Sequence, residues 1–112
     1  MRLRAFLACL FVTASGAAMA FDRPFPQDVK RGKMTPAAHP HIVIDGKPRA
    51  MAPGGRIWNQ DNLIEMPAAL RGRDLAVNYT ETDDGQIDRV WILTPQEASE
   101  PVADQRKRAL TR

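Results

Sequence analysis

Cysteine is almost absent from this sequence. Its one cysteine, Cys9, lies in an apolar N-terminal segment, so a chain that begins beyond that segment has no thiol. This excludes intrachain disulfides, thiolate metal sites, iron–sulfur clusters and thiol catalysis. Serine is also scarce, since Ser99 is the only serine after residue 20. No G-x-S-x-G, H-E-x-x-H, P-loop or dinucleotide motif is present, so the sequence predicts a protein that is not an enzyme and uses no cofactor.

The sequence also lacks a hydrophobic run as long as a typical membrane span of about 20 residues. Its uncharged N-terminal run covers residues 5–20, follows a basic start and ends in an A-x-A pattern made by Ala18 and Ala20. This is the layout of a signal peptide over residues 1–20, cleaved after Ala20. Cys9 is followed by further apolar residues, which argues against a lipid-anchor cysteine. We therefore expect an exported protein, periplasmic or secreted, without stable membrane insertion after cleavage.

A large excess of either charge is missing as well. The whole chain has a net charge of +3, but Arg2 and Arg4 belong to the predicted signal peptide. The remainder has 14 basic and 13 acidic residues, a net charge of +1. A charge so close to neutral gives no electrostatic basis for binding nucleic acid or an anionic membrane surface. The expected partner is another envelope protein, and the sequence leaves the oligomeric state open.

Composition divides the remainder into three parts. Residues 21–40 contain four prolines and no hydrophobic period, which predicts a flexible, proline-rich arm. Residues 41–98 are the segment that is able to fold. Residues 99–112 are highly charged, which predicts a helical or disordered tail. The central part favours a mainly β fold of five to six short strands with a short C-terminal helix: a small antiparallel β-barrel or β-roll, OB-like or SH3-like. An open sheet covered by a helix is the alternative.

Turn signals and alternation indicate the strands. Asp45-Gly46 between two extended runs is typical of a hairpin. In residues 75–80 apolar side chains alternate, and a turn at 83–85 sends the chain back through "QIDRVWILT", whose odd-numbered residues 87–93 should share one face. Residues 90–93 are apolar on both faces, which requires a cover on each. Thr94-Pro95-Gln96-Glu97 then matches a capping box that begins a helix.

The segments "APGGRIWNQDNLI" and "VNYTETDDGQIDRVWILTPQEA" carry a family resemblance. Together they resemble a family of small exported proteins of Gram-negative bacteria with a VNYT…RVWILTPxEA motif. The resemblance covers about residues 41–98 and leaves out the arm and the tail. It implies one compact exported β domain. The family has no established activity, so the resemblance supplies no catalytic residue.

Aromatic and cationic side chains are the candidates for binding. Trp58 precedes a polar turn and is the aromatic residue that we expect to be exposed, whereas Trp91 and Tyr79 are expected in the core. A second candidate is an anion patch of Arg71, Arg73 and Arg89, because arginine binds carboxylate or phosphate in a bidentate manner. Acidic neighbours make ordinary surface ion pairing the alternative. The leading hypothesis is a non-catalytic binding or interaction module.

The two histidines give the alternative function. His39 and His41 flank a proline, and in an extended segment both imidazoles point the same way, toward one Cu²⁺ or Zn²⁺ ion. Two ligands make a weak site, and the sequence supplies no third. This hypothesis makes the protein a small-ligand or metal-handling protein. The alternative is a solvated linker that leads into the first strand.

Overall fold

The computed structural model describes residues 23–110. The predicted signal peptide, its cleavage site at Ala18 and Ala20, and the first two residues of the arm lie outside these residues. The elements in chain order are β1 (Lys30–Pro36), β2 (His41–Ile44), β3 (Lys47–Trp58), β4 (Ile64–Glu65), the 3-10 helix η1 (Pro67–Ala69), β5 (Leu75–Glu81), β6 (Ile87–Ile92), α1 (Pro95–Ser99) and α2 (Val102–Leu110).

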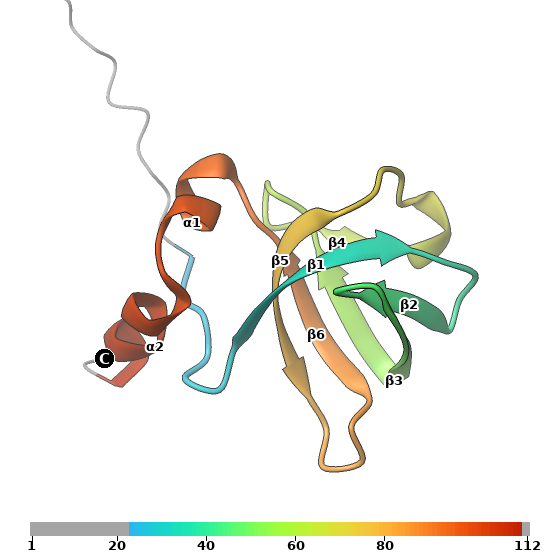
Figure 1. Cartoon of the computed structure of the whole chain (residues 1–112), viewed down its shortest axis with the longest axis horizontal. Helices are drawn as coiled ribbons and strands as arrows, with labels where there is room; N and C mark the ends of the chain where they lie inside the picture. The colour runs from blue at the N-terminus through green and yellow to red at the C-terminus, as the bar shows by residue number, and fades with distance from the viewer. Residues whose placement is uncertain (1–22, 111–112) are drawn as a thin grey trace, which may run out of the picture.

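Five of the strands close into a small barrel (Figure 1). β1 pairs with β2 and β5, β2 pairs with β3, and β5 pairs with β6, all antiparallel. The barrel closes where β3 pairs with β6, and this pairing is parallel. β4 is an additional strand at the outer edge of β3. The expected mainly β barrel with a C-terminal helix is confirmed, with a mixed rather than wholly antiparallel sheet, and its five-strand connectivity is that of an OB barrel.

A β-bulge in β6 changes which residues face the barrel interior. Thr80 pairs with Arg89 and Glu81 with Ile87, so Asp88 is an extra residue in β6. Ile87 therefore turns inward with Val90, whereas strict alternation places it outside with Trp91. The prediction that all odd-numbered residues from 87 to 93 share one face is wrong at Ile87 for this reason.

Residues 23–40 of the proline-rich arm are ordered, which corrects the expectation of a flexible segment there. Residues 30–36 form β1, and Phe25 and Val29 before it are buried. This strand cannot be recognised from the sequence, because the residues at its inward positions are Gly32 and Met34. A Cβ on Gly32 would lie 3.1 Å from side-chain carbons of both Ile44 and Tyr79, so a larger residue there would require these side chains to shift. The folded unit therefore extends beyond residues 41–98 and includes β1 and α2.

The C-terminal residues form a second layer outside the barrel. The Thr94–Glu97 capping box that begins α1 is confirmed, and the charged tail is helical in α2. Figure 1 shows both helices gathered with the N-terminal segment at one side of the barrel. Phe25, Val29, Trp91 and Leu93 form a buried cluster in this layer, separate from the barrel interior. The second apolar face of β6 is covered in this way, as its sequence required.

Candidate functional site

Five residues that are paired from strand to strand form a line across the outer face of the sheet. It runs from Ile64 on β4 through Trp58 on β3, Trp91 on β6 and Asn78 on β5 to Arg31 on β1. Residues paired in this way point to the same face of a sheet. The line is covered at the β1 end and uncovered at the β4 end, and this difference defines the candidate site.

Hydrogen bonds between amide and guanidinium groups hold the C-terminal helices against the β1 end of this line. Asn78 is 0% exposed and Gln105 of α2 is 1% exposed. The Nδ2 of Asn78 donates to the Oε1 of Gln105 at 2.7 Å, and the Nε of Arg31 donates to the Oδ1 of Asn78 at 2.7 Å. Arg31 also donates to the carbonyls of Ala98 and Glu100. The C-terminal helices are therefore fixed to the barrel by specific hydrogen bonds.

A buried ion pair joins the first described residue to α1. Arg23 is 2% exposed, and two of its nitrogens donate to the two carboxylate oxygens of Glu97, at 2.9 and 2.6 Å. Its remaining donors reach the carbonyls of Asn59 and Ile92, both at 2.7 Å. This bidentate geometry satisfies a guanidinium that is otherwise costly to bury. The N-terminal segment, β6 and α1 are thereby held as one layer.

The ion pair makes stability depend on pH. Burial tends to raise the pKa of Glu97, but hydrogen bonds from Arg23 and Thr94 and the charge of Arg23 outweigh it and hold the pKa below 4.5. A carboxyl group whose pKa is lower in the folded state stabilises the protein above its unfolded pKa, and this contribution is lost as the pH falls through the folded pKa. We expect the free energy of unfolding to decrease as the pH falls below about 4.5, measured by urea denaturation.

Two other carboxyl groups act in the same direction, so a variant is needed to isolate Glu97. Hydrogen bonds lower the pKa of Glu81, chiefly from Lys30, and of Glu100, chiefly from Arg108. Both groups are more exposed than the Arg23–Glu97 pair and are screened by solvent. The substitution Glu97→Gln should flatten the acid dependence. An unchanged dependence in that variant would contradict the assignment to Glu97.

At the β4 end the same face is open. Trp58 is half-buried, with its ring stacked on that of Trp91 at a centroid separation of 5.2 Å. Ile64, which pairs with Trp58, is 58% exposed, and its sequence neighbours Leu63 and Met66 are 62% and 69% exposed. Trp91 and Tyr79 are each 7% exposed, so their expected core positions are confirmed. We call Trp58, Leu63, Ile64 and Met66 the Trp58 surface.

Two arginines lie next to the Trp58 surface. Arg56 pairs in register with Arg89, and each arginine lies two residues before a tryptophan, Trp58 on β3 and Trp91 on β6. The guanidinium of Arg89 lies 5.7 Å from the centroid of the Trp91 ring, and its only described ion pair is with Asp88, at 3.8 Å. Arg56 is exposed, and its side chain has no hydrogen bond or ion pair with a residue in 23–110. Two adjacent like charges thus border an exposed apolar surface.

The structure does not gather the predicted arginine patch. Arg71 and Arg73 are exposed in the loop before β5, and Arg71 donates to the carbonyls of Ala68 and Leu70. Arg89 instead pairs with Thr80, near the other end of β5. The arginine that neighbours Arg89 is Arg56, which the sequence analysis missed because the β3–β6 pairing joins residues far apart in the chain.

The two histidines lie at one mouth of the barrel. His39 is in the turn between β1 and β2, and His41 is the first residue of β2, so the segment is not extended as the metal hypothesis assumed. Within residues 23–110 no group of three or more histidine, cysteine or acidic side chains is placed to hold a metal ion. The hypothesis of a two-histidine Cu²⁺ or Zn²⁺ site stays a prediction.

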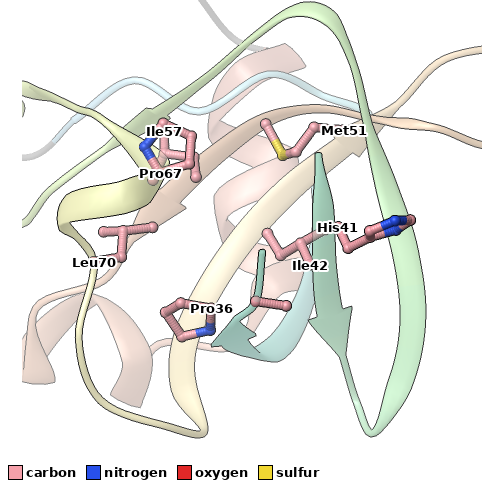
Figure 2. A pocket seen from close by; sticks show the side chains of 8 residues that line it. Pro36, His41, Ile42, Met51, Ile57, Pro67 and Leu70 are labelled. Carbon is pink, nitrogen blue, oxygen red and sulfur yellow. The ribbon is translucent and has the colours of Figure 1, made fainter. Parts of the chain in front are cut away.

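A small hollow opens beside His41 and has room for about one water molecule. Its lining residues are Pro36, Ala37, His41, Ile42, Met51, Ile57, Pro67 and Leu70. Figure 2 shows that the imidazole of His41 points away from the apolar side chains on the opposite wall. The lining of the hollow is therefore mainly apolar.

The face that OB barrels use for oligonucleotides has a different character here. That face lies on the second and third strands, and its outward residues in this chain are His41, Val43, Pro48 and Ala50. Pro48 and Ala50 offer no aromatic ring on which a base could stack, and the aromatic side chains on the outer face of these two strands are His41 and Trp58. The neighbouring loop at 82–86 contains two aspartates, which repel phosphate.

Comparison with known proteins adds no family to these observations. No protein-family model matches the chain, and no curated protein or solved structure is significantly similar to it. In the described part of the chain, no helix is long and apolar enough to cross a membrane. The resemblance of residues 41–98 to small exported proteins stays a prediction, and the function is argued from the site alone.

Proposed function

We propose that this protein is an exported, non-catalytic binding module that engages another envelope protein through the Trp58 surface. The observation that carries the proposal is the clustering of exposed apolar residues. Three of the four large hydrophobic side chains exposed in residues 23–110 fall within residues 63–66, and one of them, Ile64, pairs directly with Trp58. Isolated exposed apolar residues are ordinary, but a contiguous group is characteristic of an interaction site.

The chemistry of the surroundings supports a protein partner over a small substrate. The described hollow is too small to exclude water from a reaction. Trp58 is held by its stack on the buried Trp91, so little side-chain freedom is lost when it binds. A rigid aromatic residue ringed by apolar and cationic side chains is the composition found at the centre of protein interfaces.

The substitution Trp58→Ala tests the proposal. Residues 21–112 are exported with an affinity tag in the native host, cross-linked in the intact envelope and recovered, and bound proteins are quantified by mass spectrometry. We expect one reproducible partner whose recovery falls at least about tenfold in the variant, because a central tryptophan contributes about 2 kcal/mol or more to binding. The domain should stay folded because Trp58 is only half-buried.

Val43→Ala is the matched control. Val43 is half-buried on the opposite strand pair, β2–β3, away from the Trp58 surface. Its truncation should leave recovery of the partner unchanged. Equal loss in both variants would indicate a general folding defect. Recovery that is insensitive to Trp58→Ala would reject the Trp58 surface as the binding site.

A further inference from the structure

Among residues 23–110, no strand pairs with the outer edge of β4. It pairs with β3 alone, at the end of the strand order β2-β1-β5-β6-β3-β4. The amide of Asn59 donates to the carbonyl of Leu63, so Leu63 and Glu65 direct their backbone groups toward β3. Alternation then directs the N–H and C=O of Ile64 away from β3. No described backbone hydrogen bond outside the strand ladders uses either group of Ile64.

Side chains next to this edge form two rows on the outer face. The first row is Ile64 beside Trp58. Continuing the same register by two residues places Met66 beside Arg56, which in turn pairs with Arg89. One row is therefore apolar and aromatic, and the next ends in two cations. Two like charges directly opposite each other on neighbouring strands repel each other, and the described ion pair of Asp88, at 3.8 Å, is with Arg89 and not with Arg56.

From these features we propose that an extended segment of the partner adds as a strand to β4. Its backbone pairs with Ile64, an apolar side chain packs beside Ile64 and Trp58, and an acidic side chain two residues away interacts with Arg56. An added strand lies about 10 Å from β3, a span that an arginine and a glutamate side chain bridge together. This inference rests on the proposed function and specifies the chemistry of its partner.

A library of random dodecapeptides displayed on phage, selected on residues 21–112, is the first test. The period of a strand is two residues, so enriched peptides should carry an acidic residue two positions from an apolar one. In the double variant Arg56→Glu/Arg89→Glu the enriched charge should change from acidic to basic. The control Arg71→Glu/Arg73→Glu alters the net charge equally and should leave the acidic preference intact.

Backbone pairing has a separate test at Ile64. Ile64→Ala removes the side chain and keeps the N–H, whereas Ile64→Pro removes both. The lost N–H points away from β3, so both variants should stay folded, which thermal unfolding checks. With the best enriched peptide, fluorescence anisotropy should show that the proline variant binds at least about tenfold more weakly than the alanine variant, as expected for a lost backbone hydrogen bond.

Several outcomes would overturn strand addition. These are equal affinities of the Ile64 variants, a charge preference that does not reverse, or no enriched peptide. If the envelope partner is still lost on Trp58→Ala in those cases, the binding module stands and only its mode of recognition is wrong. If envelope capture does not depend on Trp58, the proposed function fails, whatever the peptides show.

Discussion

Replacing Arg23 with alanine is expected to lower the free energy of unfolding by about 3–5 kcal/mol. The change leaves the Glu97 carboxylate, which is 11% exposed, without its ion-pair partner. It also removes the donors to the carbonyls of Asn59 and Ile92. A domain of this size is stabilised by about 5–15 kcal/mol, so the loss is a large fraction of the total. Urea denaturation followed by circular dichroism measures it.

A second substitution separates the effect of the unpaired Glu97 carboxylate from the effect of the lost Arg23 packing. The double variant Arg23→Met/Glu97→Gln has no uncompensated carboxylate and keeps a side chain able to complete the cap of α1. It should be more stable than Arg23→Met alone. Arg73→Ala, in an exposed loop, is the control and should change stability by less than about 0.5 kcal/mol. Equal stability of the single and double variants would show that Arg23 does not act through Glu97.

Trp91→Ala should also lower the free energy of unfolding by about 3–5 kcal/mol. It removes the largest side chain of the buried cluster formed by Phe25, Val29, Trp91 and Leu93. The Trp91 ring stacks on Trp58 and meets the edge of Phe25 at a centroid separation of 5.7 Å. Its loss removes the main apolar contact between β6 and the N-terminal segment. Guanidinium denaturation provides the free energy, and near-ultraviolet circular dichroism should show loss of the coupled tryptophan signal.

The two stacked tryptophans should therefore separate stability from binding. Trp58→Ala is expected to cost only about 1–2 kcal/mol, since Trp58 is half-buried and its stack accounts for about 0.5–1.5 kcal/mol. It should nevertheless abolish capture of the partner, which Trp91→Phe should largely preserve. If truncation of Trp58 destabilised the protein as much as truncation of Trp91, the exposed face would be structural rather than a binding surface.

Most of the barrel follows from local sequence signals. The hairpins at Asp45-Gly46 and at Asp84-Gly85 join β2 to β3 and β5 to β6, and each turn lies where glycine allows a positive φ. Thr94 and Glu97 indicate the start of α1 for a similarly local reason. β1 was not predictable, because its inward residues, glycine and methionine, show no hydrophobic period.

Part of the candidate site could likewise be predicted from the sequence, and part could not. Trp58 could be identified because a polar turn follows it, and the adjacent Leu63, Ile64 and Met66 could not, since a sequence does not show which apolar residues stay uncovered. The ion pair of Arg23 and Glu97 joins residues 74 positions apart. Neither residue has a local pattern that indicates its partner. The pairing of Arg56 with Arg89 depends on a parallel contact that no turn specifies.

The bond between Arg23 and Glu97 also sets an order of events during synthesis. A chain emerges from the ribosome with its N-terminus first, so Arg23, Phe25 and Val29 appear long before the residues that bury them. Glu97 follows Arg23 by 74 positions, and Gln105 follows Arg31 by the same number. The outer layer therefore cannot close on a growing chain until these two residues have been synthesised.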